Sequence, residues 1–180
     1  MKPIAKADLI DKDQKYDYQP ELTRRLDGHM EDFDQAVIND ITLWKVNRYP
    51  VIGARLLADL NAIKKTATRY SRPKVQDILI RLLACRGIQL PMASTYLRFK
   101  NPRLFQIIDQ RVYRAIYGKE MDLPGAYNVA NRQKLAAIYF AYLCALRKSC
   151  ATLGIPFEES DRILYNADKR MNKAVKLKNY

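Results

Sequence analysis

The sequence has few cysteines, a single histidine and no glycine-rich phosphate loop, and each absence excludes a class of site. Three cysteines without a CxxC spacing predict neither a disulfide framework nor a four-thiolate zinc site. His29 is the only histidine, which excludes His-rich metal sites and argues against a Ser-His-Asp triad. The patterns GxxxxGK(S/T) and GxGxxG are both missing, so we expect no phosphate-binding loop of those types.

Long hydrophobic runs are missing as well. The longest, Leu135–Leu146, has 12 residues and is closed by Lys134 and Arg147, whereas a helix that crosses a bilayer needs about 20. The first 15 residues contain no apolar segment of the kind found in a secretory signal. These patterns predict a protein that does not enter a membrane and that is located in the cytoplasm.

Positive charge is present in excess and is unevenly distributed. The 180 residues include 32 Lys and Arg against 19 Asp and Glu, a net charge of +13. Residues 1–34 carry −3 and residues 35–180 carry +16. We therefore expect an acidic N-terminal arm over residues 1–30 and a single basic domain over residues 31–180 with a basic C-terminal tail. A body this basic attracts polyanions, with nucleic acid as the first candidate and an anionic membrane surface as the second.

Hydrophobic periodicity in the body predicts an all-α helical bundle. Val75, Ile78, Leu79, Leu82 and Leu83 follow the spacing of an amphipathic helix. Residues 128–152 predict a long helix that is apolar almost all round in its middle, as a central buried helix is. Sustained period-two alternation of strand-forming residues is absent.

Residues 78–118 contain an ordered set of features that is more specific than the rest of the chain. An amphipathic helix is followed by a tight turn at Gly87-Ile88-Gln89-Leu90-Pro91, a helix from Pro91, a break at Asn101-Pro102, the apolar pair Ile107-Ile108, Asp109, and a helix that Gly118 ends. This order resembles the helix-hairpin-helix (HhH-GPD) DNA glycosylases of the endonuclease III superfamily. The likeness covers roughly residues 30–170, and the segment around Asp161–Lys169 looks like the closing helix of bacterial relatives.

The resemblance implies a bundle that flips a damaged or modified base out of duplex DNA and excises it. It implies Asp109 as the catalytic carboxylate, which stabilises the positive charge that develops on the sugar. It assigns DNA-backbone contacts to the hairpin and the start of the second helix, and a duplex-probing loop to the end of an earlier helix. These residues are Gly87, Ile88, Gln89, Leu90, Met92, Ala93 and Ser94 in the first set and Lys45, Asn47 and Arg48 in the second.

Two basic clusters add to the expected DNA surface. The first surrounds the informative segment and has Asp109 as its only acid between residues 98 and 114. It consists of Arg98, Lys100, Arg103, Arg111 and Arg114. The second contains no acid and consists of Lys64, Lys65, Arg69, Arg72 and Lys74. Lysine and arginine clusters of this kind can follow the phosphates of a nucleic acid.

Three departures from the family pattern refine the hypothesis. Gln89 stands where the hairpin of the family has its second glycine, which allows a positive φ and a close approach to phosphate. No lysine is present at Pro91-Met92, so Schiff-base strand cleavage is not expected and the enzyme would be monofunctional. The four-cysteine iron–sulfur loop is absent, so no cofactor is expected; the resemblance leaves room only for a monovalent cation at the hairpin.

Simpler interpretations of the same residues keep other hypotheses open. Asp is a favoured helix N-cap, which accounts for Asp109 without any chemistry, and Trp44, Tyr139 and Tyr142 fit core packing. A second hypothesis is a catalytically silent helix-hairpin-helix module that binds nucleic acid. A third is a protein-interaction domain whose acidic arm docks on a partner or on its own basic body. A monomer is favoured in each case.

Overall fold

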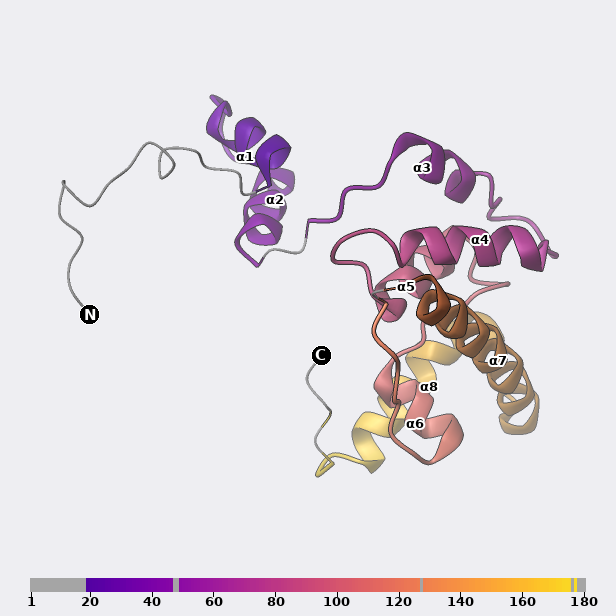
Figure 1. Ribbon diagram of the computed structural model, residues 1–180. Helices are drawn as coiled ribbons and strands as arrows, with labels where there is room; N and C mark the ends of the chain where they lie inside the picture. The colour runs from indigo at the N-terminus through magenta and orange to yellow at the C-terminus, as the bar shows by residue number, and fades with distance from the viewer. Residues whose placement is uncertain (1–18, 47–48, 127, 176, 178–180) are drawn as a thin grey trace. The chain divides into compact units, whose positions relative to one another are not determined.

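A computed structural model of the chain describes residues 19–46, 49–126, 128–175 and 177 (Figure 1). Every regular element in these residues is a helix, which confirms the all-α prediction. Asn47 and Arg48, expected in a duplex-probing loop, lie outside the described residues, as do residues 1–18 of the expected arm. None of the helices in the described ranges is long and apolar enough to cross a bilayer.

The chain divides into two compact units, Met1–Tyr49 and Pro50–Tyr180. The expected boundary at residue 30 falls inside the first unit, between α1 (Pro20–Asp27) and α2 (Gln35–Lys45). Two polar links join these helices: the Trp44 indole N–H donates to Thr23 Oγ1 at 2.9 Å, and Arg25 pairs with Asp40. None of the residues of α2 is fully buried, so polar contacts account for part of the packing between the two helices.

The second unit contains the remaining helices. They are α3 (Ala54–Asn61), α4 (Arg72–Leu82), α5 (Leu90–Lys100), α6 (Gln110–Tyr117), α7 (Val129–Leu153), the short 3-10 helix η3 (Phe157–Glu159) and α8 (Ser160–Met171). Capping residues and glycines set where several of these helices begin and end. The Asn128 side chain caps α7 by accepting from the Asn131 N–H, and Gly118 and Gly154 end α6 and α7 with φ of 64° and 65°, a left-handed conformation that favours glycine.

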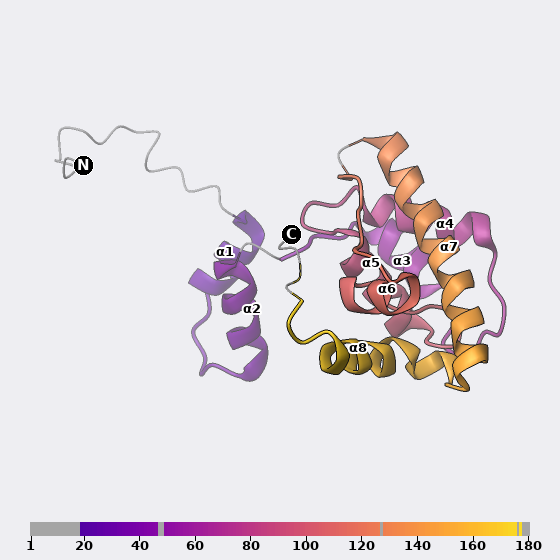
Figure 2. The same ribbon diagram turned by 90° about the horizontal axis from the view of Figure 1, so that it is seen from below.

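The core of the second unit forms around α7, as the apolar run predicts. Tyr139, Tyr142 and Leu146 are fully buried on this helix, so the two tyrosines are core residues. α4 and α5 pack against α7, and α6 packs along α8 (Figures 1 and 2). This packing brings the segment that precedes α6 between α5, α7 and α8, where the candidate site is found.

Candidate functional site

The turn between α4 and α5 occupies residues 83–89, earlier than the predicted 87–91, because α4 ends at Leu82 and Pro91 lies inside the first turn of α5, where proline is tolerated. Gly87 has φ of 80°, so a residue without a Cβ is required there. Ile88 is only 3% exposed and anchors the turn in the core. Gln89 is the N-cap of α5 with φ of −100° and an extended backbone, so this turn does not need a second glycine.

This turn, residues 83–89, borders a cavity of about 560 Å³, and we call it the hairpin after the motif that it was expected to form. Its lining comes from residues 83–91, from residues 123–126, and from Arg132 and Leu135 of α7. Gly87, Gln89 and Met92, three of the expected DNA contacts, are exposed, whereas Ile88, Leu90, Ala93 and Ser94 are buried. Any ligand at this turn would therefore meet the exposed residues and backbone of the hairpin rather than all seven side chains.

Asp109 both caps a helix and lines a cavity. It is the N-cap of α6, where its Oδ1 accepts from the Val112 N–H at 2.8 Å. It also lines a cavity of about 340 Å³, together with Ile107, Asp161, Arg162, Tyr165 and Asn166. No residue lines both this cavity and the cavity at the hairpin. Asp109 thus has an opening of its own, apart from the hairpin.

Three side chains from two helices hold the backbone just before Asp109. Ser94 Oγ on α5 accepts from the Ile108 N–H at 3.2 Å. On α7, the Tyr139 hydroxyl donates to the Gln106 carbonyl at 3.0 Å and the Tyr142 hydroxyl donates to the Ile107 carbonyl at 2.6 Å. Burial raises the pKa of both tyrosines well above 10, so they remain donors. The position of Asp109 is therefore fixed by α5 and α7 as well as by its own helix.

The surroundings of Asp109 act on its ionisation in opposite directions. Burial raises its pKa above the usual aspartate value, and the backbone N–H groups of Val112 and Arg111 lower it. The charge of Asp161 raises the pKa and the charge of Arg111 lowers it, both by less. The net effect is a rise, so Asp109 takes up a proton at a higher pH than an exposed aspartate would.

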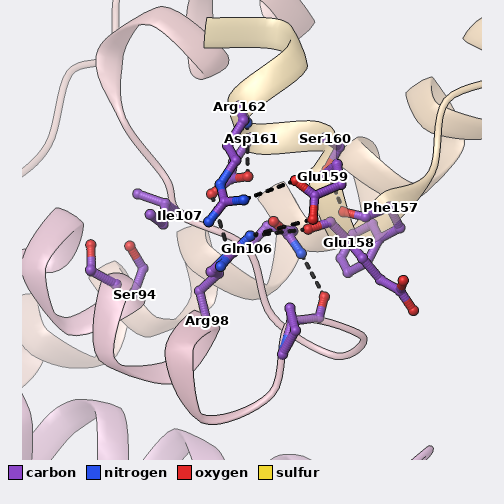
Figure 3. A network of polar contacts seen from close by, with 12 residues as sticks. Ser94, Arg98, Gln106, Ile107, Phe157, Glu158, Glu159, Ser160, Asp161 and Arg162 are labelled. Atoms are coloured by element: carbon purple, nitrogen blue, oxygen red, sulfur yellow. Dashed lines mark hydrogen bonds and ion pairs between the residues drawn. The ribbon is translucent and has the colours of Figure 1, made fainter.

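A buried ion pair joins Asp161, which lines the cavity, to Arg98 (Figure 3). Arg98 of α5 places its Nε 3.7 Å from Asp161 Oδ2, and the two side chains are 7% and 4% exposed. Arg98 Nη2 also donates to the Glu158 carbonyl at 3.3 Å. Arg98 thus joins α5 to η3 and the first turn of α8, and its guanidinium is not on the surface.

A second carboxylate, Asp168, connects α6 to α8. Its side chain is fully buried and accepts from Arg114 Nε and Nη2 at 2.8 and 2.7 Å, and from Arg111 Nη1 at 3.2 Å. Asn172 Nδ2 donates to it at 2.8 Å. The hydrogen bond from Arg114 is the main cause that lowers the pKa of Asp168, which keeps this group ionised.

These contacts show that the arginines of the first basic cluster have acidic partners within the protein. Arg98, Arg111 and Arg114 pair with acids of α8, and Arg103 pairs with Glu158 at 3.3 Å. Lys100 donates to Asn61 Oδ1 at 2.9 Å. The sequence pattern missed the acidic partners because they lie 54 to 63 residues away along the chain. The one available signal was the i, i+3, i+7 spacing of Asp161, Leu164 and Asp168, which places them on one face of α8.

The second basic cluster stays exposed, and we call it the α4-start cluster. It contains Lys64, Lys65, Arg69, Arg72 and Lys74, and none of the five pairs with a carboxylate of the described chain. Buried Asn101 holds the backbone of this loop, since its Nδ2 donates to the carbonyls of Lys64 and Ala67, both at 2.8 Å. The cluster lies at the opposite end of α4 from the hairpin (Figure 1). Lys45 is exposed at the end of α2, in the first unit.

Side chains suited to a metal do not come together in the part of the chain that the structure describes. No group of three or more His, Cys, Asp or Glu residues is close enough there to hold an ion. Comparison of the chain with protein-family models, curated proteins and solved structures finds no match. What the site does is therefore inferred from its geometry and charge.

Proposed function

We propose that the protein is a monofunctional DNA N-glycosylase of the helix-hairpin-helix type, which flips a damaged or modified base and leaves an intact abasic site. One observation carries this proposal: the Asp109 carboxylate lines a cavity of about 340 Å³ while its backbone is held by Ser94, Tyr139 and Tyr142. Ligand pockets begin at about 300 Å³. A rigidly placed carboxylate beside such a space suits a reaction that builds positive charge.

The proposed chemistry uses Asp109 in its ionised form. Cleavage of the bond between base and sugar places positive charge on the sugar, and a carboxylate of fixed position stabilises that charge without reorganising. The same carboxylate can orient or deprotonate the attacking water. The N-terminus of α6 favours the negative charge that this role needs.

Charge supports DNA as the partner. Residues 50–180 contain 24 basic and nine acidic residues, a net charge of +15, whereas residues 1–49 carry −2. Because Arg98 and Arg111 have partners within the protein, we assign the main phosphate contacts to the α4-start cluster. The exposed backbone at Gly87 and Gln89 supplies further contacts at the hairpin.

Binding of duplex DNA is expected to weaken steeply with salt, with a linear decline of log affinity against log salt, because phosphate contacts release counterions. The variant Lys64→Ala/Lys65→Ala should bind more weakly and reduce the slope by about 1 to 2. Fluorescence anisotropy over a range of salt concentrations measures both. The control, Lys169→Ala/Arg170→Ala, removes two exposed charges at the end of α8. Equal slopes in the two variants would contradict the assignment, and no binding at low salt would contradict DNA as the partner.

Base release is expected to leave an abasic site that is cut only after alkali treatment. Duplexes that each contain one damaged or modified base form the substrate panel. Borohydride should trap no covalent adduct, because a Schiff base needs an amine and the position of the family lysine holds Pro91-Met92. A trapped adduct would overturn the monofunctional assignment and would direct attention to Lys45 or Lys100. Release of no base from any duplex of the panel would count against the enzyme hypothesis.

The alternative, a catalytically silent helix-hairpin-helix module, is favoured by a different observation. The N-cap bond to Val112 gives Asp109 a structural role, and its cavity shares no residue with the cavity at the hairpin. This alternative predicts the same salt-dependent binding without base release. The excision assay therefore distinguishes the two.

A further inference from the structure

Asp109 is not the only carboxylate at its cavity. Asp161, in the first turn of α8, lines the same cavity and is 4% exposed. The sequence gives no reason to pair the two residues, because the packing of α6 along α8 is what brings them to one space. Two acids at one small cavity influence each other's charge, since each negative charge disfavours the ionised form of the other.

Asp161 is held from two sides. Its Oδ1 accepts from the Arg162 N–H at 2.8 Å, and its Oδ2 lies 3.7 Å from Arg98 Nε (Figure 3). That second distance is longer than a hydrogen bond, and Arg98 Nε is buried without a hydrogen-bond partner among the described residues. Arg98 therefore attracts Asp161 by its charge, without a hydrogen bond from Nε to the carboxylate.

We propose that Asp161, held by Arg98, is a positioning residue of the site, whose fixed negative charge acts on Asp109 and on any substrate in the shared cavity. This role rests on the proposed function for its use in catalysis, but the electrostatic link itself does not. In this arrangement two carboxylates, Asp109 and Asp161, stabilise a positive charge that develops in the cavity.

Several groups face Asp109, and their charges differ in sign. Arg111 on its own helix favours its ionised form. Asp161 from α8 disfavours it, whereas the Tyr142 hydroxyl of α7 adds no charge because burial raises its pKa and keeps it protonated. Arg162 and Tyr165 of α8 also line the cavity, and Arg98 of α5 acts through Asp161. Removal of Asp161 tests the proposal, because Asp161 is the acid that lines the same cavity as Asp109.

The test is a direct titration of Asp109 by NMR in the full-length protein. The probes are the 13C shift of its carboxyl, assigned by its loss in Asp109→Asn, and the Val112 amide, whose N–H donates to Asp109 Oδ1. The variants are Asp161→Asn and Arg98→Met/Asp161→Asn. The double variant leaves no buried unpaired charge, so it folds even where Asp161→Asn does not. Glu158→Gln is the control, because it removes one exposed negative charge that pairs with Arg103 outside the cavity.

We expect the pKa of Asp109 to fall in both variants and to fall further in Asp161→Asn, where the positive charge of Arg98 remains. Glu158→Gln should move it less than either. An unchanged pKa in a folded variant, or the failure of both variants to fold, would show that Asp161 is only structural and would overturn the proposal. If the protein excises bases, the acid limb of kcat/KM should move to lower pH in parallel. Absence of excision would overturn the proposed function alone, since the titration does not depend on it.

Discussion

Asp109→Asn is expected to reduce base excision about 100- to 1,000-fold, the loss that follows removal of one well-placed electrostatic group. Asparagine caps helices as well as aspartate does, so the bond from the Val112 N–H and the start of α6 should remain. Binding to duplex DNA should stay close to that of the unmodified protein. Single-turnover kinetics with the best substrate of the panel measures the chemical step.

A matched control exists elsewhere in the chain. Asp34 caps α2 in the same way, with its Oδ1 accepting from the Val37 N–H at 2.8 Å, and it is exposed. Asp34→Asn makes the same chemical change at the same kind of position, so it should retain full activity. Equal activity of Asp109→Asn and the unmodified protein would reduce Asp109 to a helix cap and would favour the silent-module alternative.

The stability of Asp109→Asn tests, independently of activity, whether the ionised carboxylate of Asp109 opposes folding. Because burial raises the pKa of Asp109 in the folded protein, the stability that this group contributes is present at low pH and is lost as the pH rises through the folded-state pKa. At neutral pH its ionisation opposes folding. Asp109→Asn should therefore unfold at no lower urea concentration than the unmodified protein. A carboxylate that opposes folding is typical of a functional site.

Asp168→Ala is expected to lower the free energy of unfolding by about 3 kcal/mol, because it leaves the guanidinium groups of Arg111 and Arg114 without their buried partner. Urea unfolding followed by circular dichroism measures the change, and the m-value should stay the same if the folded state is intact. The effect should be largest near neutral pH. Since the pKa of Asp168 is lowered in the folded protein, its contribution is present above the usual aspartate pKa and is lost as the pH falls through the folded-state value.

The control for this variant is Asp77→Ala. Asp77 pairs with Arg81 across one turn of α4 at 2.7 Å, but its side chain is 62% exposed, and exposed pairs contribute at most about 1 kcal/mol. A loss in Asp168→Ala no larger than in Asp77→Ala would mean that the connection between α6 and α8 does not depend on this carboxylate.

Local pattern was enough to predict the helices that frame the site. The apolar spacing of residues 75–83 predicted α4, the run around Leu135–Leu146 predicted the buried α7, and Gly118 was correctly expected to end α6. Each of these signals is read within one element, because apolar spacing and capping residues act over a few turns. The same reasoning placed Asp109 at the start of a helix.

The sequence pattern was not enough to predict which basic side chains have acidic partners within the protein. Arg98 and Arg111 were expected at a DNA surface because few acids are close to them in sequence, yet Asp161 and Asp168 meet them in the structure. The turn between α4 and α5 is a second example. Gln89 stands where the family has a glycine, and its negative φ shows that the fold of this turn needs the conformational freedom of glycine at Gly87 and not at residue 89.

The sequence by itself determined the all-α class, the strongly positive charge of the second unit, and the position of Asp109 between an apolar pair and a helix. These depend on residue type and on spacing over one or two turns. Only the tertiary structure decided that Asp161 shares a cavity with Asp109 and that Ser94 and two tyrosines hold the preceding backbone. It also decided that the α4-start cluster has no carboxylate partner among the described residues. The physical reason is that ion pairing and burial act through space, so a charge is free or neutralised according to which distant helix packs against it.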